Sequence, residues 1–355
     1  MSSAQASRQP DGSTRSSALT VAIAGATGAV GQEFLRVLEQ RDFPVAGLKL
    51  LASARSAGKK IAFKGREYTV EELTDASFQG VDLALFSAGG DTSKRFAAAA
   101  VDAGAVVVDN SSAFRMDAEV PLIVPEVNAE ALASSGIGLG KPGIVANPNC
   151  STIIMLVAVN PLRLAAGVER IIVSTYQAAS GAGAAAMAEL EQQTRQVLAG
   201  EEPTCAVFPR QYAFNLFSHN SALHDNGYNQ EEMKMVDEAR KIWAEPSLPV
   251  AATCIRVPVM RAHAESITVE LGRPVGDDEA RQIFADAPGV ELLDDRAGNR
   301  FPTPLDASGR DPVLVGRIRQ DLSHPDGRGL SFFVCGDQIR KGAALNAVQI
   351  AELML

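Results

Sequence analysis

The first apolar positions after the N-terminal seventeen residues follow a strand and then a helix pattern. The run "LTVAIA", residues 19–24, is mostly apolar and has the length of a buried strand. Glycines follow it, and apolar residues then recur at the spacing of one helix face, at Val30, Phe34, Leu35 and Leu38. The sequence therefore predicts a strand that ends at Ala24, a glycine-rich turn and an amphipathic helix.

Two further apolar runs, 81–87 and 105–109, flank a segment with helical periodicity, 91–104. Strand, helix and strand in alternation predict a parallel sheet with right-handed crossovers. The runs end in "FSAGG" and "DNSSAFRM", so we expect their polar residues at the carboxyl edge of the sheet, where ligands bind in such folds. Arg115 in the second segment is a candidate for holding an anion, and an exposed surface arginine is the alternative.

From residue 150 onward the pattern is a mixture of strands and helices. "RIIVSTYQ" predicts a strand that runs into a glycine-rich turn, and helices are predicted over 184–198 and within "YNQEEMKMVDEARKIW". "CIRVPVMRAHAESITVE" predicts two strands with a break near Arg261 and Ala262. The final segment, "RKGAALNAVQIAELML", has the pattern of an amphipathic docking helix. This part of the chain is predicted to form a mixed-sheet α+β domain.

Composition and charge indicate a folded protein that does not bind nucleic acid or membranes. Of the 355 residues, 46% are apolar and 21% are charged. The best apolar stretch, 153–159, is shorter than the roughly 18 residues that span a bilayer, and we expect Asn160 and Pro161 to end it. The net charge of −9 argues against nucleic acid or an anionic membrane as the main partner. An anionic ligand must therefore meet locally placed Arg and Lys.

The cysteines and histidines show no metal-binding or disulfide pattern. The four cysteines lie far apart, without the paired spacing of a zinc site, and the other histidines, His219, His224 and His324, show no ligand spacing with them. We expect no metal and a reducing compartment, the cytoplasm. Residues 1–17 are Ser-rich and predict a disordered tail; a transit peptide is the alternative, and Asp11 counts against it.

The glycine turn has the spacing of a dinucleotide-binding fingerprint. Gly25, Gly28 and Gly31 form G-x-x-G-x-x-G between the predicted strand and helix, and the helix N-terminus offers free N–H groups to a pyrophosphate. The expected contacts in this loop also include Thr27, Ala29 and Val30.

The end of the second strand predicts which dinucleotide binds. NAD-binding proteins carry an acid there for the ribose hydroxyls. "GLKLLASARSAGKK" has no acid but has Ser53, Arg55, Ser56 and Lys59, which favours the 2′-phosphate of NADP. A solvated basic loop is the alternative.

Cys150 in "NPNCST" is a candidate nucleophile. Asn149 is a suitable N-cap, which places Cys150 at the first position of a helix. A helix N-terminus stabilises an anion, so this position favours the reactive thiolate. An inert, small buried cysteine is the alternative.

Several motifs occur in the order found in aspartate-β-semialdehyde dehydrogenases, and the chain resembles that family from about Leu19 to its C-terminus. The motifs are "GATGAVG", "NSSAFRM", "PEVN", "NPNCST", "YQAASGAG", "EEMKM", "RVPVMRAHAES" and "RKGAALNAVQIAE". The resemblance implies reversible conversion of L-aspartate 4-semialdehyde, phosphate and NADP⁺ into 4-aspartyl phosphate and NADPH. The reductive direction would supply lysine, threonine and methionine biosynthesis.

The resemblance also implies roles for individual residues. Cys150 would become the acyl-thioester and His263 would act as acid and base, for which an imidazole that titrates near neutrality is suited. Arg256 would hold the substrate α-carboxylate, Gln177 would orient the substrate, and Lys234 would bind phosphate. Glu231, preferred to Glu232 because it shares a helix face with Lys234, would meet the substrate ammonium. Asn149 is a further candidate at the substrate site, and Ser180, Gly181 and Asn346 match cofactor contacts.

Without the family, several of these residues have ordinary explanations. His263 would be a polar residue beside a strand, and Glu231 with Lys234 a solvated helix face. The family commonly has Gly-His-Ser where this chain has Ala262-His263-Ala264, so the backbone path of His263 and one hydrogen bond are open questions.

The expected architecture is α/β with two domains. A Rossmann-like, doubly wound NADP-binding domain would comprise 18–149 with 337–355, and a mixed-sheet catalytic and dimerisation domain would comprise 150–336. By resemblance the partners are small-molecule substrates and other copies of the chain, in a homodimer or homotetramer. The alternatives are a reductase for another small acyl phosphate or acyl thioester, and a non-catalytic NADP-binding sensor.

Overall fold

The first sheet is built on the strand predicted before the glycine turn. The structure is a computed structural model that describes residues 18–355, so the tail predicted for residues 1–17 lies outside the described residues. Seven strands follow the order β3-β4-β2-β1-β5-β6-β7, all parallel except β3, which pairs antiparallel with β4. Their bounds are β1 Leu19–Ala24, β2 Val45–Ala52, β3 Lys60–Phe63, β4 Arg66–Glu72, β5 Leu83–Phe86, β6 Val106–Asp109 and β7 Gly143–Ala146.

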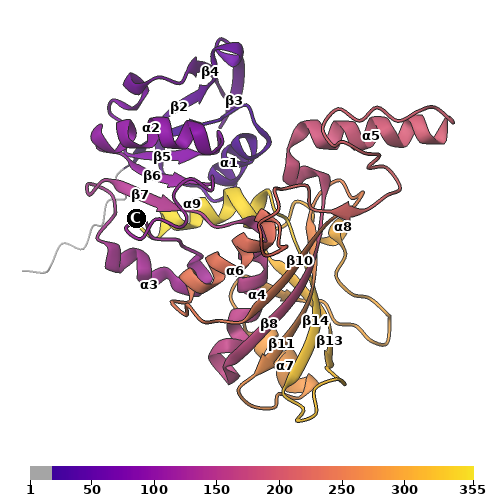
Figure 1. Ribbon diagram of the computed structural model, residues 1–355. Helices are drawn as coiled ribbons and strands as arrows, with labels where there is room; N and C mark the ends of the chain where they lie inside the picture. The colour runs from indigo at the N-terminus through magenta and orange to yellow at the C-terminus, as the bar shows by residue number, and fades with distance from the viewer. Residues whose placement is uncertain (1–17) are drawn as a thin grey trace, which may run out of the picture.

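Helices cover both faces of this sheet, as the predicted doubly wound domain requires (Figure 1). Val21 and Ile23 pack with α1 (Ala29–Gln40) and the C-terminal α9 (Leu345–Glu352), whereas Ala22 and Ala24 pack on the other face with α2 (Gly90–Asp102). Each strand is therefore buried on both sides, which is typical of parallel sheets. A further helix, α3 (Pro125–Ser135), lies between β6 and β7 in the chain.

The second sheet is mixed, also as predicted. Its order is β12-β13-β14-β11-β8-β10-β9, with β8 parallel to β10 and antiparallel to β11. One face packs on α4, α6 and α7 around the largest apolar core. The bounds are α4 Cys150–Ala166, β8 Val168–Gln177, α5 Ala184–Leu198, β9 Phe217–Ser218, α6 Gln230–Ile242, β10 Val250–Arg256, β11 His263–Leu271, α7 Asp277–Ala285, β12 Val290–Leu292, α8 Pro304–Ala307, β13 Val313–Gln320 and β14 Gly329–Gly336.

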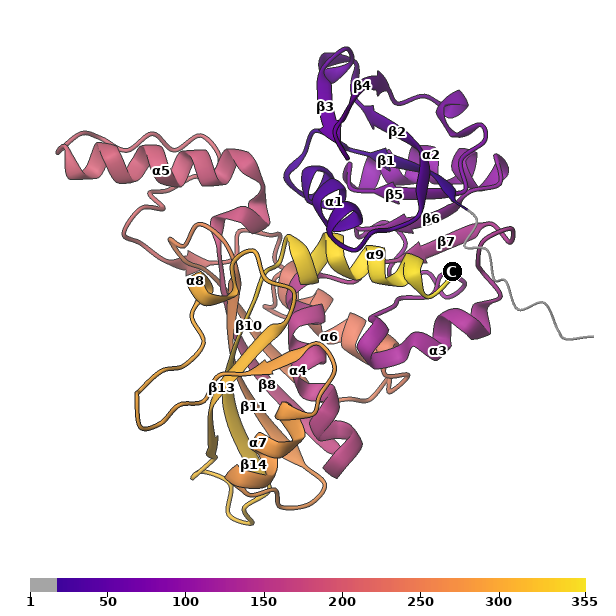
Figure 2. The same cartoon turned by 180° about the vertical axis from the view of Figure 1, so that it is seen from behind.

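The other face of the second sheet is open in the single chain. Ile172 and Tyr176 on β8 are 38% and 37% exposed. Helix α5 extends away from the body of the molecule beside this domain, in both views (Figures 1 and 2). Among residues 18–355, no helix combines the length and the apolar character that crossing a membrane requires.

One helix continues beyond the apolar stretch that ends at Asn160 and Pro161. α4 does not end at Pro161 but continues to Ala166, because Asn160 donates its side-chain amide to the Glu126 carbonyl and the helix is buried on all sides from Ser151 to Asn160. A proline inside a helix removes one hydrogen bond, and burial of the apolar residues offsets that loss here.

The C-terminal segment is not a simple amphipathic helix. It opens with a π-helical turn, η4 (Arg340–Ala344), before α9, and residues 340–348 are all buried. This segment lies between the two sheets (Figure 2), so it has no solvent-facing side in its first two turns.

Candidate active site

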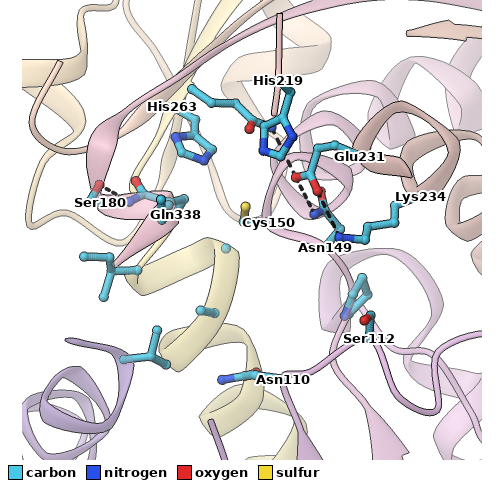
Figure 3. A pocket seen from close by; sticks show the side chains of 18 of the residues that line it. Asn110, Ser112, Asn149, Cys150, Ser180, His219, Glu231, Lys234, His263 and Gln338 are labelled. Atoms are coloured by element: carbon cyan, nitrogen blue, oxygen red, sulfur yellow. Dashed lines mark hydrogen bonds and ion pairs between the residues drawn. The ribbon is translucent and has the colours of Figure 1, made fainter. Parts of the chain in front are cut away.

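A cavity of about 430 Å³ opens where α4, α6, η4 and the ends of β8 and β10 meet (Figure 3). Eleven residues that the sequence singled out line it. They are Val30, Arg115, Asn149, Cys150, Gln177, Ser180, Gly181, Glu231, Lys234, Arg256 and His263. Segments separated by more than two hundred residues therefore contribute to one site.

Cys150 occupies the first position of α4, as the sequence predicted. The Asn149 side chain accepts hydrogen bonds from the backbone N–H groups of Ser151 (3.0 Å) and Thr152 (3.3 Å), and so caps the helix. A Cβ added to Gly342 in η4 would lie 2.7 Å from the Cys150 Cβ, so only glycine fits against the thiol from that side.

The predicted thiolate is not the resting state of Cys150. Burial and the nearby Glu231 carboxylate raise the pKa of the thiol to about 12, against the opposing effects of Arg115 and Lys234. The helix N-terminus favours the anion by only about 0.3–1 kcal/mol at an exposed site, and desolvation outweighs it. Cys150 therefore carries a neutral thiol.

His263 is also neutral. Burial and the Arg256 guanidinium lower the pKa of His263 to about 3, below the near-neutral value that the sequence analysis assumed. Its Nδ1 accepts the Ala178 backbone N–H at 3.1 Å, so the neutral ring carries its proton on Nε2. A Cβ added to Gly181 would lie 2.9 Å from Nε2, which leaves glycine as the residue that fits there.

The structure shows the backbone path at His263, which the sequence left open because Ala262 and Ala264 replace a glycine and a serine common in the family. Ala262 adopts φ +72°, the left-handed conformation that glycine favours, so this chain keeps that backbone path without glycine. Its N–H donates to Gln338, which in turn donates to Ser180. Ala264 faces the opposite side of β11, in a small apolar cluster with Leu314 and Cys335, so a serine there would not reach the cavity from this backbone.

Arg256 presents an unpaired donor. One terminal nitrogen donates to the Ala178 carbonyl (3.1 Å) and the other to Nε2 of His219 (2.6 Å). Its Nε–H has no hydrogen-bond partner among residues 18–355, although the side chain is buried. The guanidinium lines the cavity, and its positive charge there is suited to an anion such as a carboxylate.

A buried carboxylate lines the same cavity as this arginine. Glu231 Oε2 pairs with Lys234 Nζ at 3.0 Å, and Oε1 accepts the side-chain amides of Asn149 (2.8 Å) and Gln177 (3.3 Å). Burial would raise the pKa of Glu231, but Lys234, His219 and these hydrogen bonds lower it to about 2. Glu232 points elsewhere, since it closes a capping box with Asn229 and accepts the Cys254 N–H. Glu231 is thus the glutamate that faces the cavity.

Arg115 is buried and not a surface residue. It pairs with the buried Glu238 at 3.0 Å and donates to the carbonyls of Asn147 (2.9 Å) and Asn110 (2.8 Å). Glu238 also accepts the Asn149 backbone N–H. This pair fixes the loop that precedes Cys150, and the Arg115 side chain still lines the cavity.

A second cavity of about 520 Å³ lies at the glycine turn, and both cavities include Ser87 in their walls. Gly25 has φ +93°, and a Cβ there would lie 2.3 Å from the Ser87 carbonyl oxygen. Gly28, Thr27 and Ser53 also line this cavity. α1 begins here without a side-chain cap, which leaves its first N–H groups free for a phosphate. These residues fit a dinucleotide.

Other predicted cofactor residues lie less directly on this cavity. Arg55 is exposed in the turn after β2, where Ser56 contacts the Thr27 hydroxyl at 3.5 Å. Asn346 lines neither cavity, because it is buried and hydrogen-bonded to Asn147 and Lys341. Glu72 and Arg95 line the second cavity and were not predicted from the sequence.

Several residues of the first cavity were missed as well. Asn110 and Ser112 belong to "DNSSAFRM", and Gly342 to "RKGAALN", segments in which the sequence analysis singled out other residues. His219 and Gln338 had no sequence signal, because their partners Arg256 and Ser180 are distant in the chain. Among the described residues, no group of three or more His, Cys, Asp or Glu side chains is arranged to hold a metal ion.

Comparisons with known proteins agree over both halves of the chain. Residues 20–135 match the family model "Semialdehyde dehydrogenase, NAD binding domain", and residues 159–341 match "Semialdehyde dehydrogenase, dimerisation domain". The aspartate-semialdehyde dehydrogenase of Synechocystis is 55% identical over 96% of this chain and 98% of its own, and that of Aquifex aeolicus is 52% identical over 94% and 97%.

Solved structures give the same result. Aspartate semialdehyde dehydrogenase II of Vibrio cholerae, "complexed with ASA", superposes with a TM-score of 0.91 at 48% identity and covers 96% of this chain and 98% of its own. The enzyme "with NADP" from Candida albicans has a TM-score of 0.73 at 25% identity, with coverages of 95% and 98%.

Proposed function

Because the chain belongs to the aspartate-semialdehyde dehydrogenase family, with an NAD(P)-binding domain and a dimerisation domain, we propose that it reversibly converts L-aspartate 4-semialdehyde, phosphate and NADP⁺ into 4-aspartyl phosphate and NADPH. The observation that carries the detailed proposal is the content of one cavity. A thiol and an imidazole share it with an arginine and a carboxylate, the two charges that an amino acid requires.

The substrate is held by its α-amino-acid end. Arg256, whose side chain lines the cavity, binds the α-carboxylate, and Glu231 binds the ammonium. Gln177 orients the substrate, and Lys234 and Arg115 provide positive charge for phosphate. Binding of the amino-acid end in this way directs the aldehyde group of the substrate toward Cys150.

Cys150 and His263 carry the covalent chemistry. The thiol proton passes to Nε2 of His263 as the sulfur bonds to the aldehyde carbon, and the imidazolium protonates the carbonyl oxygen to give a thiohemiacetal. His263 then removes the hydroxyl proton as the hydride leaves, and a thioester remains. Bound NADP⁺ would accept that hydride. Phosphate displaces the Cys150 sulfur from the thioester carbon, and His263 returns the proton to sulfur.

Because Cys150 and His263 are both neutral, the proposed reaction steps require two changes in the site. A base at Nε2 requires the tautomer protonated at Nδ1, so the contact with the Ala178 N–H must open during turnover. Arg256 is one of the groups that lower the pKa of His263, so pairing of Arg256 with the substrate carboxylate raises that pKa toward a useful value.

The test is the initial rate of NADPH formation from L-aspartate 4-semialdehyde and NADP⁺, with and without phosphate. We expect turnover that requires phosphate and is abolished in Cys150→Ala, which should still bind NADPH because the glycine turn is a separate cavity. Cys205→Ala is the matched control, since that cysteine is exposed and should leave the rate unchanged. Substantial activity in Cys150→Ala would contradict the assignment.

The preference for NADP is supported by the basic turn after β2. We predict that Arg55→Ala raises the Michaelis constant for NADP⁺ far more than that for NAD⁺, because the guanidinium would pair with the 2′-phosphate. Glu72 lines the cavity at the glycine turn, and an acid of this kind can bind the ribose hydroxyls of NAD⁺. Measuring the Michaelis constants for both cofactors therefore separates the two alternatives. Equal effects of Arg55→Ala on both cofactors would rule out the 2′-phosphate contact.

We further propose that the enzyme is a cytoplasmic homodimer or homotetramer that serves lysine, threonine and methionine biosynthesis. Support for the assembly comes from the dimerisation-domain match and from the open sheet face with Ile172 and Tyr176. The division into 18–149 with 337–355 and 150–336 is likewise our proposal, supported by the packing of α9 in the first core and α4 in the second.

A further inference from the structure

His219 connects the two charged groups proposed to hold the amino acid. It follows the short strand β9, and its backbone N–H donates to the Cys254 carbonyl at 2.8 Å, which fixes it beside the end of β10. Figure 3 shows its ring between His263 and Glu231, on the wall of the cavity above Cys150. The sequence analysis gave His219 no role.

The contacts of the ring fix where its proton lies. A guanidinium only donates, so Nε2 of His219 accepts from Arg256 at 2.6 Å and must be unprotonated. The proton of the neutral ring is therefore on Nδ1, which lies 3.1 Å from the Ser221 hydroxyl and donates to it. The Ser221 backbone N–H also points at Nδ1, at 3.3 Å, but a protonated Nδ1 cannot accept it. We assign the proton from the shorter contact with the charged Arg256, which requires Nε2 to be the acceptor.

Ser221 links the His219 ring by hydrogen bonds to α6, the helix that carries Glu231. Its hydroxyl oxygen accepts the Glu231 backbone N–H at 3.1 Å, and its own proton is directed to Asn229 Oδ1 at 3.3 Å. Asn229 is the N-cap of α6. An unbroken chain of hydrogen bonds thus runs from Arg256 on β10 through His219 and Ser221 to the first turn of α6.

The charges around the ring favour this arrangement. Arg256 faces His219 from β10, and Glu231 and Lys234 face it from α6. Burial lowers the pKa of His219 to about 4, with Arg256 and Lys234 acting in the same direction and Glu231 opposing them. The ring is therefore neutral at physiological pH, the form that can accept from a guanidinium.

We propose that His219 and Ser221 are positioning residues that fix Arg256 and Glu231 relative to one another, and so select amino-acid aldehydes over aldehydes without the amine. This inference rests on the proposed function. It assigns no proton transfer to His219, because its Nε2 is occupied by Arg256 and its Nδ1 by Ser221.

The test compares two substrates in three variants. We would measure kcat and KM for L-aspartate 4-semialdehyde and for 4-oxobutanoate, the analogue without the amine, in His219→Leu, His219→Gln and Ser221→Ala. His219→Leu should lower the ratio of the two kcat/KM values by about tenfold, mainly through KM for the amino-acid aldehyde, as expected when one charge-linked hydrogen bond is lost. His219→Gln offers an acceptor and a donor and should recover the ratio to within about threefold.

Ser221→Ala keeps the Arg256 contact and should shift the ratio in the same direction, by about threefold. KM values for NADP⁺ and phosphate should not change in these variants. His324→Leu is the matched control, because this histidine lies outside the cavity. Thermal unfolding shows whether each variant is folded. If His219→Leu does not fold, the substrate ratio of Ser221→Ala tests the inference instead.

Equal losses for both substrates, or a glutamine variant as impaired as the leucine variant, would overturn the inference. Either result would leave the proposed function intact if the wild-type enzyme shows phosphate-dependent turnover of L-aspartate 4-semialdehyde. Absence of that turnover in the wild type would instead overturn the proposed function and this inference together.

Discussion

At the scale of single residues, burial decides the protonation of the site. The sequence placed Cys150 at a helix start and correctly predicted its cap, but it could not show how much water the cavity excludes. Desolvation acts on both groups, raising the pKa of Cys150 and lowering that of His263, so both are neutral. Such effects depend on neighbours that are distant in the chain, which a local pattern does not contain.

Alkylation of Cys150 should reveal its raised pKa. Iodoacetamide reacts with the thiolate, whose fraction rises with pH until the pKa is passed. Because the pKa of Cys150 is about 12, we expect the rate in the ligand-free enzyme to rise through about pH 10 without a plateau. The experiment uses a Cys205→Ser background, since Cys205 is exposed and would also react. A plateau below about pH 8 would show that the resting thiol is activated.

Ala262 should carry conformational strain. Its φ of +72° is unfavourable for a residue with a Cβ, so Ala262→Gly is expected to raise the free energy of unfolding. The gain should be about 0.5–1 kcal/mol, measured by urea denaturation. Ala264→Gly is the control, because Ala264 lies in the extended strand β11, where glycine should destabilise the protein. A loss of stability in both variants would contradict the account.

At the scale of elements, the sequence predicted what local patterns encode. The strand before the glycine turn, α1, α5, α6 and the cap of α4 were predicted, because apolar periodicity and capping residues lie within a few positions of one another. The π-helical turn η4 and the continuation of α4 through Pro161 were not predicted. Both depend on burial between the two sheets, a tertiary effect.

The turn η4 should determine the position of the thiol. Gly342→Ala would place a methyl group 2.7 Å from the Cys150 Cβ, so either η4 or the thiol must move. We expect kcat to fall by about tenfold or more, since displacements near 1 Å are costly at reacting atoms. Gly138→Ala is the control, because a Cβ there meets open space. Unchanged kcat in Gly342→Ala would mean that the thiol position is not critical.

At the scale of the whole molecule, one site is built where two domains meet. The first sheet could be predicted from its strand and helix alternation, but the order of the second could not, because its strands pair across long separations in the chain. The domains are also joined by charge. Glu33 on α1 binds both Arg340 in η4 (2.8 Å) and Arg261 (3.3 Å), the residue before Ala262 and His263. Helix α1 is thus connected to the segment that carries the imidazole.

The most direct test of the central claim is a single turnover without phosphate. Enzyme at micromolar concentration would be mixed with saturating NADP⁺ and L-aspartate 4-semialdehyde, and NADPH followed by absorbance, with peptide mass spectrometry of the quenched protein. We predict a burst of about one NADPH per chain, an acyl group on Cys150, and release of that group when phosphate is added. No burst in enzyme that turns over with phosphate, or a burst that leaves Cys150 unmodified, would contradict the thioester mechanism.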